Sequence, residues 1–284
     1  MRPVRKELPA RLFDATVTLA GAEDGILQNA LIDTLGNYCS YCEMPLTGFH
    51  NEHYRYRAAW EPAVDLNQWQ DLLLICADCR SHIQKPVISA EEADNMLWPD
   101  LDLTFAPNVQ SPLLYELRNV KLFKEDEQGN FGPPEDTQMV FVTTNPASDA
   151  ETVQRAQNTI DFFQLNMPAV FYNAATNELR LPFAYVQQRL DNRIFKRTDA
   201  WFEAQRAVER LNAMDNLGHT EVAGLMKNLL REQIKDHAHF SGNWSVWVTV
   251  FDNAGTDDAT LRQLFTDDKR YFSGTDEATL FSEK

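Results

Sequence analysis

Four cysteines stand in two pairs, with two residues inside each pair: Cys39 and Cys42, then Cys76 and Cys79. Two such pairs, with residues 43–75 between them, can supply four thiolates to one tetrahedral zinc ion. Four thiolates leave no open position for water, so this ion would hold the fold and cleave nothing. The alternative is four reduced cysteines that only pack together, and the repeated spacing favours zinc over it.

Glu52 and His53 lie between the two cysteine pairs, and Arg55 and Arg57 follow them closely. A histidine beside a carboxylate in a zinc-stapled loop is suited to hydrolytic chemistry. The planar guanidinium groups can each bind a phosphate through two hydrogen bonds, and the alternative for them is solvated surface charge. The sequence therefore places its candidate chemistry between the cysteine pairs.

This segment resembles the zinc-stapled HNH endonucleases. Glu52–Arg57 matches a motif of the form E-H-[FY]-R-P-K, and Trp69–Cys76 matches W-x-N-L-L-L-x-C. The likeness is to one branch of that family, the PtuB nucleases of Septu-type antiphage systems and the HNH effectors attached to retrons. Ala156–Ile160, with Leu165 and Asn166, is similar to the later A-x-x-T-I and L-N motifs of that branch.

The resemblance implies roles for the residues that match it. The general base would be His53, because a neutral imidazole can take a proton from the attacking water. Glu52 would bind a catalytic Mg2+ or Mn2+ through oxygen. Asp71 stands where the family has an asparagine that orders the loop, and an ionised aspartate accepts such hydrogen bonds without donating any. Arg80 stands where the family often has the last metal ligand, so the resemblance assigns that role to His82.

The resemblance also implies that Arg55, Arg57 and Arg80 bind the scissile phosphate. Tyr56 replaces the proline that is usual in the first motif. The implied function is a metal-dependent DNA endonuclease, the effector of a bacterial antiphage system. It would work in a hetero-oligomer with an ATPase partner similar to PtuA. Two alternatives stay open: a catalytically degenerate zinc-binding adaptor of such a complex, and an RNA or tRNA nuclease.

The composition is strongly acidic. The 284 residues contain 26 Lys and Arg against 42 Asp and Glu, which gives a formal net charge of −16. Proteins that bind DNA alone are usually basic, so a local basic patch or a basic partner would have to overcome this repulsion; the alternative is that the charge serves solubility alone. No long apolar run or signal-peptide pattern is present, so we expect a cytoplasmic protein that does not enter a membrane.

We predict an α+β chain in four segments: a small ββα-metal nuclease module stapled by the four-cysteine zinc site, and a mainly α-helical remainder. Residues 1–35 form a helical entry segment with a helix at Asp24–Leu35, and residues 36–86 form the module. Residues 87–147 connect them through short strands at Leu114–Phe123 and Met139–Thr143, with a turn at Asp126–Glu135. Residues 148–284 form a helical domain.

The helices of the last segment are predicted from apolar residues at helical spacing. A capping box, Ser148–Glu151, would begin the first helix, and a short helix near Asp257–Phe265 would be the last. Two longer helices lie between them, and we expect their apolar faces to pack within the chain: Trp201, Ala204, Val208 and Leu211 on one, and Val222, Leu225, Met226, Leu229 and Leu230 on the other.

Overall fold

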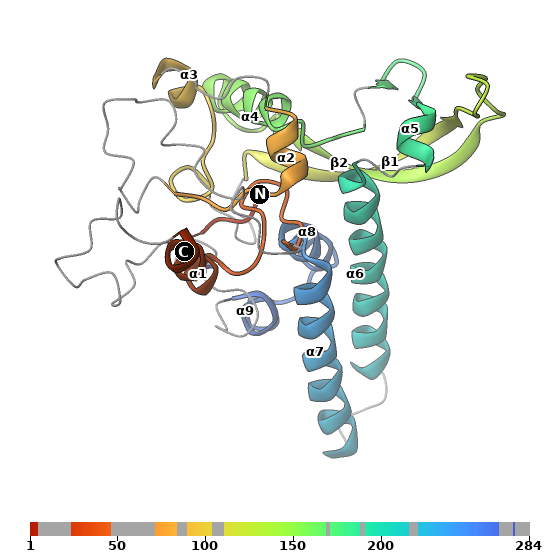
Figure 1. The fold of residues 1–284 in the computed structure, drawn as a ribbon. Helices are drawn as coiled ribbons and strands as arrows, with labels where there is room; N and C mark the ends of the chain where they lie inside the picture. Colours follow the sequence, from red (N-terminus) through yellow and green to blue (C-terminus); the bar gives the residue numbers. More distant parts are fainter. Residues whose placement is uncertain are drawn as a thin grey trace.

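The computed structural model describes residues 1–4, 24–46, 72–83, 90–103, 111–168, 171–187, 191–215, 221–266 and 275. Over these residues the chain is a mixed α/β protein in which helices surround a four-stranded sheet (Figure 1). The elements in chain order are α1 (Asp24–Leu35), α2 (Ala77–Ser81), α3 (Ala90–Asp94), β1 (Leu113–Lys124), β2 (Glu135–Thr144), α4 (Ala150–Phe162), β3 (Tyr172–Asn173), β4 (Glu178–Leu181), α5 (Phe183–Gln187), α6 (Arg193–Asp215), α7 (Glu221–Ser241), α8 (Trp244–Asn253) and α9 (Asp258–Phe265).

The sheet is built around a long antiparallel hairpin of β1 and β2. Leu113 stands opposite Thr144 at one end and Leu122 opposite Glu135 at the other. In the connecting turn Asp126 Oδ1 accepts the backbone N–H of Asn130 at 2.8 Å. β4 adds parallel to β1, and β3 adds antiparallel to β4, which gives the order β2-β1-β4-β3. The two predicted strands and the turn between them are confirmed, but this part of the expected irregular connecting region (87–147) is a long hairpin, with strands of 12 and 10 residues where short strands were expected.

The edge strand β2 is covered on both of its faces. Val140 and Val142 point into the main hydrophobic core, whereas Met139 and Phe141 point into a second cluster with Leu179 of β4. Since successive side chains of a strand point to opposite faces, four consecutive buried residues require packing on both faces. Helices α4 and α6 both pack against this strand.

Side chains also cover the open backbone edge of β2. The Val142 N–H donates to Asn166 Oδ1 at 2.8 Å, and Asn166 Nδ2 donates back to the Val142 carbonyl at 2.8 Å. The Val140 N–H donates to Thr198 Oγ1 of α6 at 2.9 Å. These bonds satisfy buried edge groups that would otherwise be unpaired or open to strand pairing.

Helices α6 and α7 run side by side as a long hairpin that projects away from the sheet (Figure 1). Near the sheet α8 packs against α6, and its Trp244 and Trp247 are fully buried. The Trp244 indole N–H donates to the Phe265 carbonyl at the end of α9, at 2.8 Å. The two tryptophans are therefore core residues, and the predicted face of α6 is buried at Trp201 and Ala204.

The predicted packing of α7 is wrong over its first half. Val222, Leu225, Met226 and Leu229 are 65%, 66%, 50% and 62% exposed. Their spacing is that of an amphipathic helix, but this part of α7 extends beyond the body of the protein (Figure 1). Over the described residues, these apolar side chains thus face outward, while Ile234 and Ala238 in the second half are buried.

Two smaller predictions also need correction. The N-cap of α4 is Asp149, whose Oδ1 accepts the Thr152 N–H at 2.9 Å, so Ser148 does not cap this helix. The short strands β3 and β4 fall inside the segment expected to be helical. By contrast, α1 has the predicted bounds, and α9 is capped by Asp257 as its predicted position requires.

Buried residues from all four predicted segments join one hydrophobic core. Leu35 of α1, Leu74 and Cys79 of the cysteine segment, Val140 of β2 and Trp247 of α8 all belong to it. The cysteine segment is thus packed into the rest of the chain. Among the described helices, none is both long enough and apolar enough to cross a membrane.

Candidate metal centre

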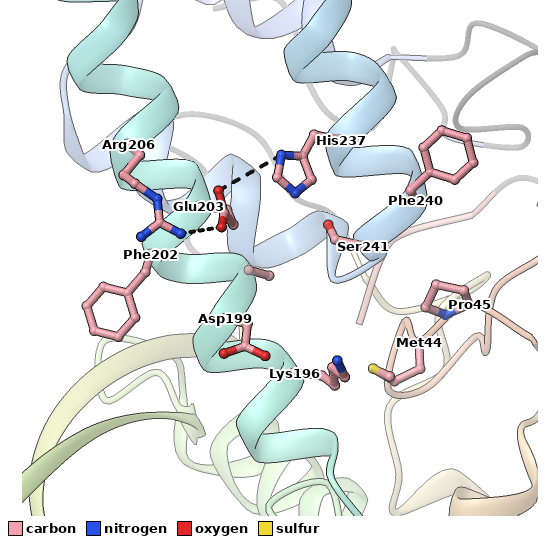
Figure 2. A pocket seen from close by; sticks show the side chains of 11 residues that line it. Met44, Pro45, Lys196, Asp199, Phe202, Glu203, Arg206, His237, Phe240 and Ser241 are labelled. Atoms are coloured by element: carbon pink, nitrogen blue, oxygen red, sulfur yellow. Dashed lines mark hydrogen bonds and ion pairs between the residues drawn. The ribbon is translucent and has the colours of Figure 1, made fainter.

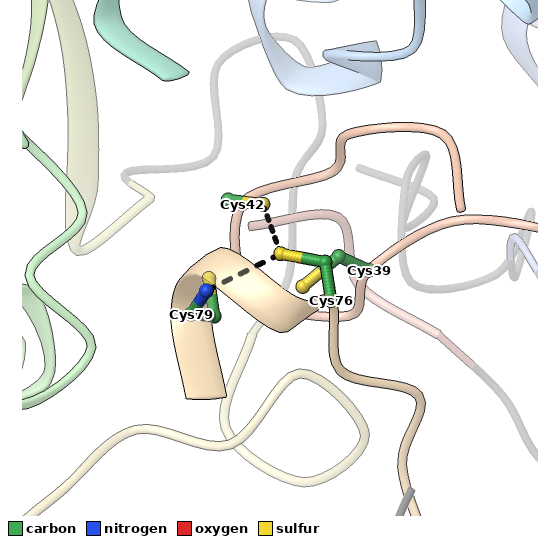
Figure 3. Close-up of side chains that lie close together, drawn as sticks. All are labelled: Cys39, Cys42, Cys76 and Cys79. Atoms are coloured by element: carbon green, nitrogen blue, oxygen red, sulfur yellow. Dashed lines mark hydrogen bonds between the residues drawn. The ribbon is translucent and has the colours of Figure 1, made fainter. Parts of the chain in front are cut away.

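The four cysteines converge on one point, as both pairs predict (Figure 3). Their Sγ atoms all lie within 4.8 Å of one another, all four are free thiols, and none is more than 9% exposed. Four sulfurs at about 2.3 Å from a tetrahedral zinc ion would stand about 3.8 Å apart. The distance between Cys42 Sγ and Cys76 Sγ is 3.5 Å, so the cluster is compatible with zinc.

The first pair lies on a tight knuckle, residues 38–45. Tyr38 and Pro45 form an antiparallel bridge, and the Cys39 N–H donates to the Met44 carbonyl at 2.9 Å. The chain reverses through Glu43, which has a positive φ of 64° and donates its N–H to the Cys39 carbonyl at 3.0 Å. This reversal brings the two thiols of the pair to the same side.

The second pair uses the beginning of a helix. Cys76 is the N-cap of α2, and its Sγ accepts the Cys79 N–H at 3.4 Å. The buried residues 72–75 lead into this helix, and the Ser40 N–H donates to the Leu74 carbonyl at 2.8 Å. That bond ties the second pair directly to the first knuckle.

The ionisation of the thiols shows why this cluster fits a cation. Burial alone would raise the pKa of Cys39, but hydrogen bonds from Cys42, Cys76 and Cys79 outweigh it and hold that pKa well below its usual range. Hydrogen bonds with the other three thiols, and then burial, raise the pKa of Cys76. Burial, and then hydrogen bonds with Cys39 and Cys42, raise the pKa of Cys79. One thiolate is thus favoured, and further thiolates so close together require a positive charge, which zinc would supply.

Arg193 provides a fixed positive charge beside the cluster. Its guanidinium is 1% exposed and donates to Cys79 Sγ at 3.1 Å and to the Phe163 carbonyl at 2.9 Å. Burial would lower the pKa of Arg193, but Cys79 and Asp191 outweigh that effect and raise it. A zinc ion with four thiolates carries a net charge of about −2. Arg193 would therefore balance part of the charge of the loaded site.

Glu43 connects the first knuckle to the helical core. Its buried carboxylate pairs with the Met1 ammonium at 2.7 Å and accepts the Ser245 N–H at 2.7 Å and hydroxyl at 2.6 Å. The Asn243 N–H donates to the Glu43 carbonyl at 3.0 Å. A Cβ on Gly242 would lie 2.7 Å from Pro45 Cδ, so this close approach requires glycine.

Arg80 and His82 follow the second pair on α2, at its outer end. Arg80 is exposed, and His82 is the C-cap residue with its side chain 21% exposed. His82 Nε2 lies 3.0 Å from Asp191 Oδ2. The other predicted site residues lie outside the described residues; these are Glu52, His53, Arg55, Arg57 and Asp71.

Sequence reasoning missed Asp191 and Arg193. They lie more than 100 residues from α2 in sequence, and Asp-x-Arg is too common a pattern to single out. Their signal is structural: Arg193 is among the largest fully buried side chains, and a buried arginine needs charged or polar partners. Cys79 and Asp191 are those partners.

A cleft of about 600 Å³ lies between the first knuckle and helices α6 and α7 (Figure 2). Met44 and Pro45 of the knuckle form one wall, and α6 and the end of α7 form the others. Its Glu203 pairs with Arg206 and has an oxygen 4.0 Å from His237 Nδ1. The lining also includes Lys196 and Asp199, so acidic and basic side chains face the same cleft.

Comparison of the chain with protein-family models, with curated proteins and with solved structures gave no significant match.

Proposed function

We propose that this chain is a metal-dependent HNH endonuclease that cleaves DNA, as the effector of a bacterial antiphage system with an ATPase partner. The observation that carries the proposal is the closed four-sulfur cluster, which fixes α2 and leaves His82 at its partly exposed outer end. Four thiolates leave no open coordination position for water, so the cluster would have a structural role and would hold other residues in place.

In this proposal the reacting groups come from the segment between the pairs and from the residues that follow the second pair. His53 takes a proton from the attacking water, and Arg55, Arg57 and Arg80 hold the phosphate. Glu52 and His82 would hold a divalent ion, which would supply stabilisation of the charge that develops on the phosphate. The net charge of −16 then limits binding of DNA until the partner delivers it.

The test is cleavage of plasmid DNA by the purified chain, alone and with an ATPase similar to PtuA, in Mg2+ or Mn2+. Wild type should nick or linearise the plasmid, and His53→Ala should lose at least about 100-fold of that activity. His237→Ala is the matched control, because this exposed histidine lies on α7. Intact plasmid with wild type and both variants would refute the proposal. Parallel digestion of labelled RNA and labelled DNA would distinguish an RNA nuclease from a DNA nuclease.

A second candidate function, a non-catalytic adaptor, is favoured by the exposed apolar face of α7. Val222, Leu225, Met226 and Leu229 form this face; Phe240, 77% exposed, lies further along α7 beside the cleft of Figure 2. Contiguous exposed apolar side chains mark interaction sites. The exposed acids on the same helix, Glu221 and Asp236, suit a partner whose apolar groove has a basic rim.

The adaptor is tested on the same complex. Leu225→Glu with Leu229→Glu should abolish co-purification with the ATPase, whereas Asn228→Glu, also exposed on α7, should not. Loss of binding together with undiminished cleavage by the chain alone would assign the two roles to separate surfaces. Retained binding by the double variant would exclude this face as the docking site.

A further inference from the structure

The histidine at the end of α2 has one defined partner. His82 Nε2 lies 3.0 Å from Asp191 Oδ2, and the described residues contain no other hydrogen-bond partner for this ring. The Asp191 side chain is 3% exposed, whereas that of His82 is 21% exposed. The pair thus joins a buried carboxylate to a ring that reaches the surface.

The Asp191 carboxylate is fixed by the start of α6. Oδ1 accepts the Arg193 backbone N–H at 3.0 Å, and the guanidinium donates to Oδ1 at 3.1 Å and to Oδ2 at 2.7 Å. Burial alone would raise the pKa of Asp191, but bonds from His82 and Arg193 outweigh it and lower that pKa. The carboxylate is ionised, so it can only accept hydrogen bonds.

An acceptor at Nε2 determines the tautomer of the neutral ring. The proton must lie on Nε2, and the lone pair must lie on Nδ1. We propose that Asp191 is a positioning residue for His82, which holds the ring so that Nδ1 alone presents a lone pair to a cation or a proton at the reaction site. This inference rests on the proposed nuclease function, in which His82 belongs to the site.

The same contacts tie His82 to the cysteine cluster. Arg193 bonds Asp191 on one side and Cys79 Sγ, at 3.1 Å, on the other. The ring is therefore held at two places, by its own backbone in α2 and by a buried ion pair anchored on the cluster. Carboxylate partners that orient histidines in this way are worth about 10–100-fold in metal affinity or activity.

Asp78, half-buried on α2, is the other carboxyl group near this pair. Burial, and then the charge of Asp191, raise its pKa. Over the described residues, the hydrogen bond to the ring comes from Asp191, at 3.0 Å, so Asp191 is the carboxylate that orients it.

The first test uses the wild-type chain, so it does not depend on a variant that folds. Long-range 1H–15N NMR spectra in the alkaline range, in which imidazoles are neutral, report which ring nitrogen carries the proton. His82→Asn assigns the signals by difference. We expect a single tautomer with the proton on Nε2. A proton on Nδ1, or a mixture of tautomers, would overturn the inference.

The second test is Asp191→Asn, which keeps the shape. Arg193 still needs an acceptor, so the amide oxygen should face it and the amide NH2 should face His82. Two donors cannot bond each other, so the ring proton should move to Nδ1. The matched control is Asp199→Asn, at an exposed position of α6, which should leave the tautomer unchanged. An unchanged tautomer in Asp191→Asn would also overturn the inference.

Cleavage assays on the same variants keep the two proposals apart. If wild type cleaves DNA, Asp191→Asn should lose about 10–100-fold in rate and Asp199→Asn should lose none. If Asp191→Asn cleaves like wild type, the positioning role is wrong although the nuclease stands. If wild type never cleaves, the proposed function fails. The NMR result still decides whether Asp191 determines the tautomer of His82.

Discussion

The two cysteine pairs have the same spacing but opposite surroundings. The first knuckle is enclosed: Glu43 is buried among Met1, Ser245 and the backbone of Asn243. The second pair lies on α2, from which Arg193 and Asp191 lead outward to the partly exposed His82.

The difference shows that two motifs with the same spacing can have different roles in one protein. The carboxylate of the first knuckle, Glu43, is held by contacts that end in the core, so its main role is in the fold. The second pair has a polar connection to the surface, so it can affect a residue that meets solvent. Sequence spacing alone makes these pairs equivalent, and the residues around them separate the two roles.

The largest effect is expected from loss of a cysteine ligand. It should be the same for either pair, because both pairs belong to one cluster. Cys42→Ser and Cys79→Ser should each lose bound zinc and cooperative unfolding, since structural zinc sites contribute about 10 kcal/mol or more in isolated zinc-finger peptides. Zinc content per chain and thermal unfolding by circular dichroism measure this. Ser81→Ala, at an exposed position of α2, is the control. Full zinc content in Cys79→Ser would contradict the four-thiolate site.

A smaller effect should appear in the second pair alone. Arg193→Met leaves the buried Asp191 with His82 as its remaining side-chain partner, and should cost about 3 kcal/mol and weaken zinc binding. Arg197→Met is the matched control on α6, because Arg197 is equally buried but donates to the Leu165 carbonyl at 2.8 Å. Urea unfolding measures the stability of both variants, and competition with a chelator measures their zinc affinity, which should fall in Arg193→Met alone. Equal zinc affinity in both variants would argue against the role of Arg193.

A pH-dependent effect should mark the first knuckle. Burial would raise the pKa of Glu43, but the Met1 ammonium and Ser245 outweigh it and lower that pKa. Its contribution is therefore present above the ordinary glutamate pKa of about 4.3 and is lost as pH falls through the lower folded value. Glu43→Gln should cost about 2 kcal/mol at neutral pH and progressively less in acid. Urea unfolding across that range measures the change, and a constant difference would contradict it.

The smallest effect on stability should come from the outer end of the second pair. His82→Asn should change the free energy of unfolding by less than about 1 kcal/mol, because the ring is partly exposed and Asp191 keeps Arg193. The same urea assay measures it. A loss as large as that of Arg193→Met would mean that His82 is a structural residue, and the contrast between the pairs would weaken.

Local patterns in the sequence were enough for much of the fold. The cysteine spacing predicted the cluster, and the β-branched and apolar residues of Leu114–Phe123 and Met139–Thr143 predicted β1 and β2. Helical periodicity gave the bounds of α1. These features depend on residues within a few positions of one another, which is the range over which a single sequence is informative.

The parts that were missed depend on distant contacts. No residue near Val222 or Leu225 indicates that α7 extends past the body, so its apolar spacing predicts a packing face. Asp191 meets His82 across 109 residues, and neither has a local signature. The catalytic roles of Glu52 and His53 remain predictions, since both lie outside the described residues.

The bond between Glu43 and Ser245 also bears on how the chain matures. The two residues are 202 positions apart. A ribosome that adds about 5–20 residues per second needs roughly 10–40 s to make the intervening chain. Throughout that interval the first knuckle lacks α8 and the carboxylate of Glu43 lacks its hydroxyl and amide donors. The support of the first knuckle by α8 is therefore completed late in biosynthesis, although all four cysteines are present once Cys79 is made.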